Sequence, residues 1–157
     1  MLIRAATAAD IPAMIGLERQ CVTAAHWTEE QYRQAFQSGS ATRLVLVVES
    51  PAPLASRPSV VGVVAGFLVA RRLAAEWELE NIVVAPTARH QGLGKRLLDA
   101  LFSAARETSG GSVFLEVRES SAAARSLYER AGFEQTGRRK GYYADPLEDA
   151  VLYRRGL

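Results

Sequence analysis

The segment from Asn81 to Lys95 has the residue types needed to hold a phosphorylated ligand. An apolar run at 82–84 leads into a junction that contains Gly92 and Gly94 among basic residues. Free backbone N–H groups and the positive dipole end at a helix start attract anions, and glycines let phosphates approach the main chain closely. The segment therefore predicts a site for a phosphorylated cofactor. A tight strand-to-helix turn beside solvated basic residues gives the same pattern, so this alternative stays open.

Two common phosphate-binding loops do not fit this junction. A P-loop has Gly at the place held here by Arg89, and Ser or Thr at the place held by Arg96. A dinucleotide-binding fingerprint would need its third Gly at Leu97, on the helix face that should pack against the sheet. The pattern that remains, Arg-x-x-Gly-x-Gly from Arg89 to Gly94, resembles the coenzyme A pyrophosphate loop of the GNAT acetyltransferase superfamily.

Glu116 is the first candidate for reaction chemistry. It lies near the end of an alternating apolar run at 112–118, which predicts a strand. Ligands of an open α/β sheet collect beyond the carboxyl ends of its parallel strands, where this residue and the glycine junction would both lie. A carboxylate there suits a general base or a water-mediated proton acceptor. The alternative is an ion pair with Arg118 or Arg89.

Tyr128 is the second candidate. It lies in a predicted helix beside the core-facing stripe formed by Ala124, Leu127 and Ala131, so an ordinary packing tyrosine is one interpretation. If the helix begins near the cofactor, the hydroxyl could instead protonate a departing coenzyme A thiolate as a general acid.

A series of strands and helices must position these residues. The sequence predicts strands at 2–6, 43–48, 60–70, 75–84, 112–118, 133–140 and 149–154, helices at 7–18, 28–39, 90–107 and 120–132, and an exposed proline-rich loop at 49–59. This order predicts a mixed α/β sheet with helices on both faces, in which strands 75–84 and 112–118 are parallel. Within strand 75–84, alternation predicts Leu79 and Asn81 on the same face.

Composition narrows the class of protein. A chain of 157 residues with 48% hydrophobic residues fits a single domain, 1–157. The formal charge of +2, from 19 basic and 17 acidic residues, argues against a nucleic-acid partner. The lone Cys21 cannot form an internal disulfide, and Asp10 and Glu18 would interrupt a secretory signal, so we expect the cytoplasm. The longest apolar run, 60–70, is too short to span a bilayer, so no membrane association is expected.

Three motifs occur in order and at compatible spacing, and together they look like the RimI-type N-alpha-acetyltransferases within the GNAT superfamily. They are Arg89-x-x-Gly92-x-Gly94, Leu115-Glu116-Val117-Arg118, and Ala122-Ala123-Ala124 with Leu127-Tyr128-Glu129-Arg130-Ala131-Gly132-Phe133. Further similarity lies at Trp27-Thr28-Glu29, at Asn81 to Val84 and at Arg138 to Tyr143, so the resemblance covers most of the chain. It implies a three-layer fold with a central, mostly antiparallel sheet that contains one parallel pair.

The resemblance also implies roles for individual residues. It makes Glu116 the base and Tyr128 the acid of a direct acetyl transfer from acetyl-CoA in a ternary complex, with no metal. It implies that acetyl-CoA is bound by Ile82, Val83, Val84, Arg89, His90, Gln91, Gly92, Leu93, Gly94 and Lys95. RimI-like enzymes commonly have Asn at the position of Ser121 and use that side chain to contact the cofactor, so the resemblance implies a cofactor contact at Ser121. A serine can replace one hydrogen bond of the amide but not both.

The acceptor implied by the resemblance is the N-terminal amine of a protein or peptide, such as the N-terminal alanine of a small-subunit ribosomal protein. Trp27, Tyr142 and Tyr143 are the substrate-binding candidates, although the tyrosines also suit packing at a core or an edge. Two other functions stay open: acetyl transfer to a small-molecule or lysine amine, and an acetyl-CoA-binding module without chemistry. The sequence assigns no oligomeric state.

Overall fold

A seven-stranded mixed sheet forms the centre of the structure, a computed structural model that describes residues 1–37, 42–51 and 62–157. The strands lie in the order β1-β2-β3-β4-β5-β7-β6, and neighbours are antiparallel except for β4 and β5. The elements are β1 (Leu2–Ala5), α1 (Ile11–Arg19), α2 (Glu29–Gln37), β2 (Arg43–Ser50), β3 (Val63–Leu73), β4 (Glu76–Val84), α3 (Leu93–Glu107), β5 (Ser112–Arg118), α4 (Ala122–Arg130), β6 (Glu134–Tyr143) and β7 (Glu148–Gly156), with short 3-10 turns at Ala8–Asp10 and Pro86–Ala88. The predicted order and the predicted parallel pair are confirmed.

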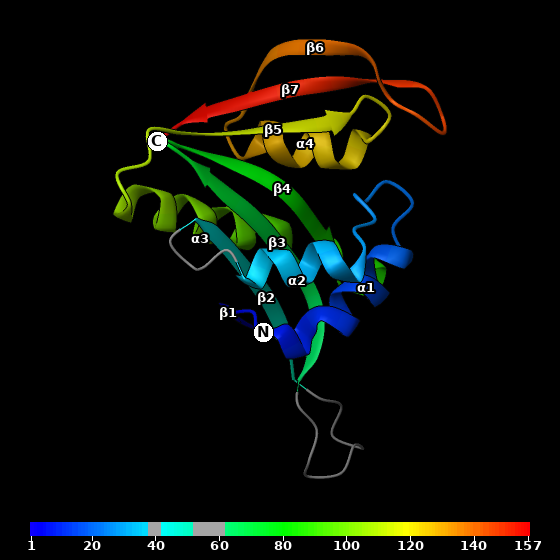
Figure 1. The fold of residues 1–157 in the computed structure, drawn as a ribbon, viewed down its shortest axis with the longest axis vertical. Helices are drawn as coiled ribbons and strands as arrows, with labels where there is room; N and C mark the ends of the chain where they lie inside the picture. The colour runs from blue at the N-terminus through cyan, green and yellow to red at the C-terminus, as the bar shows by residue number, and fades with distance from the viewer. Residues whose placement is uncertain (38–41, 52–61) are drawn as a thin grey trace.

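Helices cover both faces of this sheet (Figure 1). On one face lie α1 and α2, where the ring of Tyr32 packs edge-on against Phe67 of β3 with centroids 6.0 Å apart. On the other face lie α3 and α4, and Leu127 of α4 reaches the first turn of α3 at Gly94. The sheet is therefore the middle of three layers.

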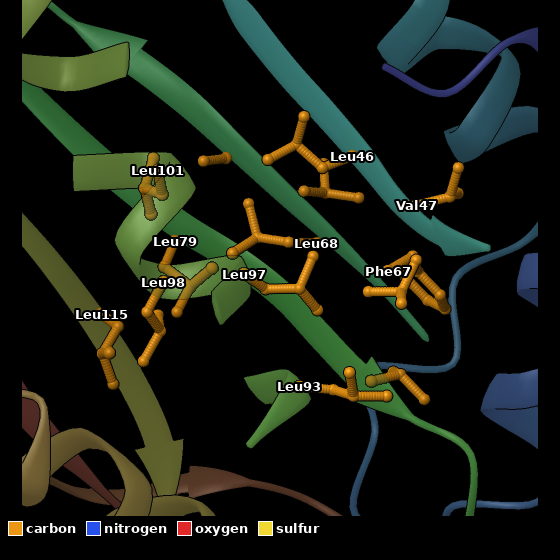
Figure 2. Close-up of a cluster of buried hydrophobic side chains, with 14 of the residues drawn as sticks. Leu46, Val47, Phe67, Leu68, Leu79, Leu93, Leu97, Leu98, Leu101 and Leu115 are labelled. Atoms are coloured by element: carbon orange, nitrogen blue, oxygen red, sulfur yellow. The ribbon is translucent and has the colours of Figure 1, made fainter. Parts of the chain in front are cut away.

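The apolar stripe of α3 supplies much of the core between the sheet and the second helical layer. Leu93, Leu97, Leu98 and Leu101 are at most 2% exposed, and they recur at helical spacing. Figure 2 shows them facing side chains of β2 and β3, including Leu68. Complete burial of each such side chain stabilises the fold by about 1.5–3 kcal/mol relative to exposure. This packing holds the first turn of α3 in place over the sheet.

The sequence predicts a helix from about His90, but α3 begins at Leu93. Both His90 and Gly92 have positive φ angles, 60° and 74°, which a right-handed helix cannot include. Gly92 is instead the residue that precedes the first helical turn. Because glycine adopts this left-handed conformation at no steric cost, it allows the sharp change of direction that aims α3.

A bulge at Glu80 changes the face that β4 side chains reach. Leu79 lies opposite Ala70 and Asn81 lies opposite Val69, so Glu80 has no partner in the register with β3. One extra residue turns the side chains that follow it to the other face. Leu79 therefore lies with the leucines of α3 (Figure 2), whereas Asn81 hydrogen-bonds to α1 and α2. The prediction that Leu79 and Asn81 share a face is wrong, because simple alternation assumes an unbroken ladder.

β4 and β5 pair only near their starts. The paired residues are Glu76 with Ser112, Trp77 with Val113 and Glu78 with Phe114. Figure 1 shows the two strands diverging from there toward their carboxyl ends. The edge of β4 over 79–84 that faces β5 therefore has no strand partner among the described residues. Such an edge offers backbone N–H and C=O groups to another extended chain.

Some predictions fall on residues outside the described ranges. Most of the proline-rich loop at 49–59 does so, although Glu49 and Ser50 belong to β2, and the predicted end of the second helix at 38–39 also does. Within the described ranges, no helix is both long and apolar enough to cross a membrane. The same residues contain no group of three His, Cys, Asp or Glu side chains that could hold a metal ion.

Candidate active site

The first turn of α3 presents free backbone donors beside the carboxyl end of β4. No side chain caps this helix end and no acidic residue lies in its first turn. The first helical hydrogen bond runs from the Arg96 N–H to the Gly92 carbonyl at 3.0 Å, so the N–H groups before it lack helical partners. A Cβ at Gly94 would lie 2.9 Å from Leu127 Cδ2, whereas Gly92 faces open space. The geometry suits an anion at this helix end.

The side chain of Arg89 turns toward α1. Its guanidinium donates hydrogen bonds to the Val84 carbonyl at 3.4 Å and to Cys21 Sγ at 3.2 Å. Arg89 therefore ties the end of β4 to the end of α1, and it does not form the ion pair with Glu116 that the sequence leaves open. Lys95, in the first turn of α3, is exposed and forms an ion pair with Asp99 at 2.6 Å.

Ser121 carries an unpaired polar atom in a buried position. The residue is 6% exposed and precedes the first turn of α4, yet its Oγ has no hydrogen-bond partner. A buried hydroxyl without a partner costs about 1–3 kcal/mol. A ligand atom at this place would remove that cost, so the environment fits the cofactor contact that the resemblance implies for Ser121.

Glu116 is held by side chains of β6. Its Oε1 lies 2.8 Å from Arg139 Nε, and its carboxylate accepts a hydrogen bond from the Tyr142 hydroxyl. The negative charge of Glu116 raises the pKa of Tyr142 above its ordinary value. The sequence leaves open an ion pair with Arg118, but Arg118 pairs with Glu148 of β7 at 3.5 Å. Glu116 is thus in an ion pair, and its partner is Arg139.

Tyr128 is buried among aromatic rings. Its ring lies 5.7 Å from that of Phe133 and 6.2 Å from that of Tyr153, measured between centroids. Burial raises the pKa of Tyr128 well above its ordinary value, with a smaller contribution from Tyr143. The hydroxyl therefore keeps its proton at neutral pH, as a general acid must.

Glu116 and Tyr128 approach the parted strands from opposite faces of the sheet. Leu115 of β5 points toward the leucines of α3 (Figure 2), so the next residue, Glu116, points to the face that carries α1 and α2. Tyr128 belongs to α4, on the α3 face. Tyr143 lies close to both. Burial and then the charge of Glu116 raise its pKa to about 12, and Tyr143 in turn raises the pKa of Tyr128. A proton donor and a proton acceptor thus lie on opposite faces of the sheet, both near Tyr143.

The substrate-binding candidates form two separate groups. Tyr142 and Tyr143 contact each other edge-to-face, with ring centroids 5.1 Å apart, and Tyr142 is half exposed. Trp27 instead packs against Tyr32 at 5.3 Å and lies under the guanidinium of Arg43 at 5.7 Å. The structure brings the tyrosines to Glu116 and anchors the tryptophan on the helical layer of α1 and α2.

Two residues at the site are not predicted by the sequence patterns. The sequence does not indicate a partner for Arg139, because the register that carries it to Glu116 depends on bulges in β6. Glu18 is 1% exposed and hydrogen-bonds to Asn81. A signal for Glu18 does exist, since a charged residue there falls on the helical stripe of Ile11 and Met14.

Residues 13–133 match the sequence model of the Acetyltransferase (GNAT) family. This range contains the start of α3, Glu116 and Tyr128. The chain belongs to the GNAT acetyltransferase family. The sequence resemblance to that family is therefore confirmed, and so is the expected GNAT-like fold. The family uses acetyl-CoA, which agrees with the anion-binding geometry at the start of α3.

Individual GNAT relatives cover part or all of this chain. The [Ribosomal protein bS18]-alanine N-acetyltransferase of Escherichia coli K12 is 39% identical over 93 residues, 58% of this chain and 63% of the relative. The N-alpha-acetyltransferase RimI of Mycobacterium tuberculosis is 42% identical over 80 residues, 51% of this chain and 49% of the relative. The crystal structure of the Escherichia coli ribosomal-protein-S18-alanine N-acetyltransferase has a TM-score of 0.78 and 28% identity, covering 99% of this chain and 92% of that one. The sequence matches thus span less than two thirds of these curated relatives.

Proposed function

We propose that this GNAT protein is an N-alpha-acetyltransferase that transfers acetyl from acetyl-CoA to the N-terminal amine of a protein or peptide. The proposal is supported by the free edge of β4 and the uncapped start of α3, in a sheet that carries Glu116 on one face and Tyr128 on the other. A thioester arm needs backbone partners, and a pyrophosphate needs an anion site. The free edge of β4 offers the backbone partners and the start of α3 offers the anion site, and Glu116 and Tyr128 supply a base and an acid.

The residues present fit acetyl-CoA. The main chain of Ile82 to Val84 would hold the thioester arm, and the N–H groups from His90 to Lys95 would hold the pyrophosphate. Ser121 Oγ supplies a donor that is buried and unpaired in the free protein. Bound there, acetyl-CoA supplies an activated acetyl group on a thiol leaving group.

The chain's own residues would then move two protons. Glu116 accepts a proton from the acceptor amine, directly or through a water molecule, so that the amine becomes a neutral nucleophile. A backbone N–H on the free edge of β4 stabilises the negative charge on the carbonyl oxygen under attack. Tyr128 gives its proton to the departing sulfur, and its burial keeps that proton available. The amine nitrogen would bond directly to the acetyl carbon as the carbon–sulfur bond breaks, so no acetylated enzyme is formed. The second proton that the nitrogen loses on becoming an amide would return to Tyr128 through solvent.

An alpha-amine suits this base better than a lysine does. The alpha-amine has a pKa of about 8 and the lysine amine a pKa of about 10.4, so the alpha-amine is neutral far more often at neutral pH. The relatives named for alanine N-acetylation of a ribosomal protein support a protein N-terminus, and we propose an N-terminal alanine of this kind as the first acceptor to test. The reaction would take place in the cytoplasm.

A peptide panel tests the proposal. Short peptides that differ only in their first residue are incubated with acetyl-CoA and the protein, and thiol release is measured. We expect turnover on peptides with a free N-terminus, with the highest rate on alanine. The matched control is each peptide with a blocked N-terminus and one internal lysine, which should give almost no thiol.

Two results would contradict the proposal. A clear preference for free lysine or a polyamine over every peptide would reassign the acceptor to a small-molecule amine. Tight acetyl-CoA binding in calorimetry, with no thiol released on any amine, would instead leave a binding module without chemistry.

A further inference from the structure

Glu18 is a buried carboxylate for which the proposed reaction has no use. It lies in the last turn of α1 and is 1% exposed. Among the described residues, no Lys, Arg or His lies within salt-bridge distance of it. Burial of a carboxylate without a cation is costly, and a well-packed apolar side chain avoids that cost. Stability alone therefore does not account for an acidic residue here.

The carboxylate is held by hydrogen-bond donors from three different segments. The Trp27 N–H donates to Oε2 at 3.1 Å, and Asn81 Nδ2 donates to Oε1 at 2.5 Å. The Tyr32 hydroxyl also hydrogen-bonds to the carboxylate, and it accepts a bond from Asn81 Nδ2 at 3.3 Å. Trp27 lies between α1 and α2, Tyr32 lies in α2 and Asn81 lies in β4. Only a group that accepts several bonds at once can join all three.

These donors belong to the two binding regions of the proposed reaction. Trp27 is the substrate-binding candidate on the side of α1 and α2, where it would contact the acceptor peptide. Asn81 follows the bulge at Glu80 directly and precedes Ile82 to Val84, the stretch proposed to hold the thioester arm. The bulge is what turns Asn81 toward Glu18. The same hydrogen bonds thus fix the loop on one side and the strand on the other.

We propose that Glu18 is a positioning residue that couples acceptor binding to acetyl-CoA binding. Its carboxylate fixes the segment at Trp27 and the main chain of Ile82 to Val84 relative to each other. When acetyl-CoA orders Ile82 to Val84, the segment at Trp27 is ordered with it. Binding of the acceptor peptide at Trp27 likewise orders Ile82 to Val84, because coupling between two sites is reciprocal. The inference rests on the proposed function, since it needs both ligands.

The test exchanges the donor and the acceptor of one hydrogen bond. Glu18→Gln replaces one of the two acceptor oxygens by an amide NH2 group, so one hydrogen bond is lost and a donor faces a donor. Asn81→Asp places two carboxylates side by side. The double variant Glu18→Gln/Asn81→Asp restores one donor, one acceptor and the original charge. Tyr32→Phe removes only one of the donors and serves as a milder variant if a single exchange fails to fold.

The measured quantity is the coupling factor. Calorimetry gives the Kd of coenzyme A with and without a saturating acceptor peptide from the panel, and the ratio of the two values is the factor. In the wild type we expect a ratio of about five or more. Glu18→Gln and Asn81→Asp should bring it near one, the double variant should return it to within about twofold of the wild type, and Tyr32→Phe should lower it partly.

Asp10→Asn is the matched control. Asp10 lies at the opposite end of α1, is also buried, and accepts hydrogen bonds of 2.9 Å from both terminal nitrogens of Arg4. Its loss should lower the melting temperature and leave the coupling factor unchanged. A general loosening of α1 would instead lower the factor in Asp10→Asn as well, and that result would overturn the role given to Glu18.

The failure of each idea has its own signature. If the wild type acetylates no peptide, the proposed function fails. If the wild type is active and shows a coupling factor of one, or keeps its factor in Glu18→Gln, the inference about Glu18 is overturned while the proposed function stands. A double variant that folds and binds coenzyme A without recovering any coupling would also overturn it.

Discussion

The two sides of the proposed site are built from different groups. On the cofactor side, the start of α3 and the free edge of β4 present backbone N–H and C=O groups, with Gly92 and Gly94 keeping the approach open. On the acceptor side, the groups are side chains: Glu116 with Arg139, and the pair Tyr142 and Tyr143. One side depends on the path of the main chain, and the other depends on which side chains meet.

This difference separates a general task from a specific one. Backbone donors recognise phosphate and an extended amide chain, which every acetyl-CoA molecule has. Side chains on β6 can change without disturbing that recognition, because β6 is at the edge of the sheet, two strands away from β5. Substitutions on the two sides should therefore affect different kinetic constants.

The largest effect is expected for the two proton-transfer residues. Glu116→Gln and Tyr128→Phe should each lower kcat by about 100-fold or more, because each removes one proton-transfer group. The Kd of acetyl-CoA, measured by calorimetry, should stay within about twofold. Activity that survives undiminished in both variants would refute the assigned roles.

The next effect belongs to the cofactor side. Gly92→Ala forces an alanine into a left-handed conformation at φ 74°, at a cost of about 1–2 kcal/mol. If the turn relaxes, the start of α3 moves, and the Kd of acetyl-CoA should rise by about tenfold. The peptide KM at saturating acetyl-CoA should not change.

Gly16→Ala is the control for this prediction. Gly16 lies in α1, and a Cβ at this position would have nothing within 4 Å, so an alanine there should be neutral or slightly stabilising. If Gly92→Ala changes the peptide KM as much as the acetyl-CoA Kd, the two sides do not act independently.

A smaller effect is expected for Arg139→Gln on the acceptor side. Arg139 is more than half exposed, and exposed ion pairs contribute only about 0.2–1 kcal/mol, so kcat/KM for the peptide should fall about two- to fivefold. The cause is the loss of the donor that orients Glu116. Acetyl-CoA binding should be unaffected, and a rise in kcat/KM would mean that Arg139 obstructs the acceptor.

The smallest effect is a difference in acid sensitivity. A hydrogen bond from Ser120 lowers the pKa of Glu148, and the Gly141 N–H lowers the pKa of Asp149. Because both pKa values are lowered in the folded state, the stabilisation is present above the ordinary carboxyl pKa of about 4 and is lost as pH falls through the lowered values. Hydrogen exchange should therefore increase between β6 and β7 before it increases in α3. If exchange increases at the same pH in both places, these carboxylates do not stabilise the pairing of β6 with β7.

The local structure of the proposed cofactor side could be predicted from the sequence because its signal is local. Gly92 and Gly94 lie close together in the chain, and their conformational requirements can be read without knowing what packs on them. The stripe of Leu93, Leu97 and Leu101 likewise predicts α3 and its buried face. The start of α3 differs by a few residues from the prediction because His90 adopts a positive φ, which its residue type does not indicate.

The acceptor side could not be predicted in the same way, since its contacts depend on register. Arg139 reaches Glu116 across β7, and irregularities in β6 decide where it falls. The face of Asn81 depends on the bulge at Glu80, which nothing in the alternation of β4 indicates. Local preferences determine the elements, whereas insertions of one residue in a ladder decide which side chains meet.

The short parallel pairing of β4 with β5 also has a consequence for the lifetime of the protein. It leaves two portions of the sheet, β1 to β4 and β5 to β7, whose strands pair with each other only at the starts of β4 and β5. A ligand bound along the free edge would bridge these portions and so oppose their separation. At a concentration one hundred times its Kd, such a ligand adds about 2.7 kcal/mol to the free energy of unfolding. We expect proteases to degrade the protein more slowly when acetyl-CoA is abundant, so that its turnover follows the supply of its own substrate.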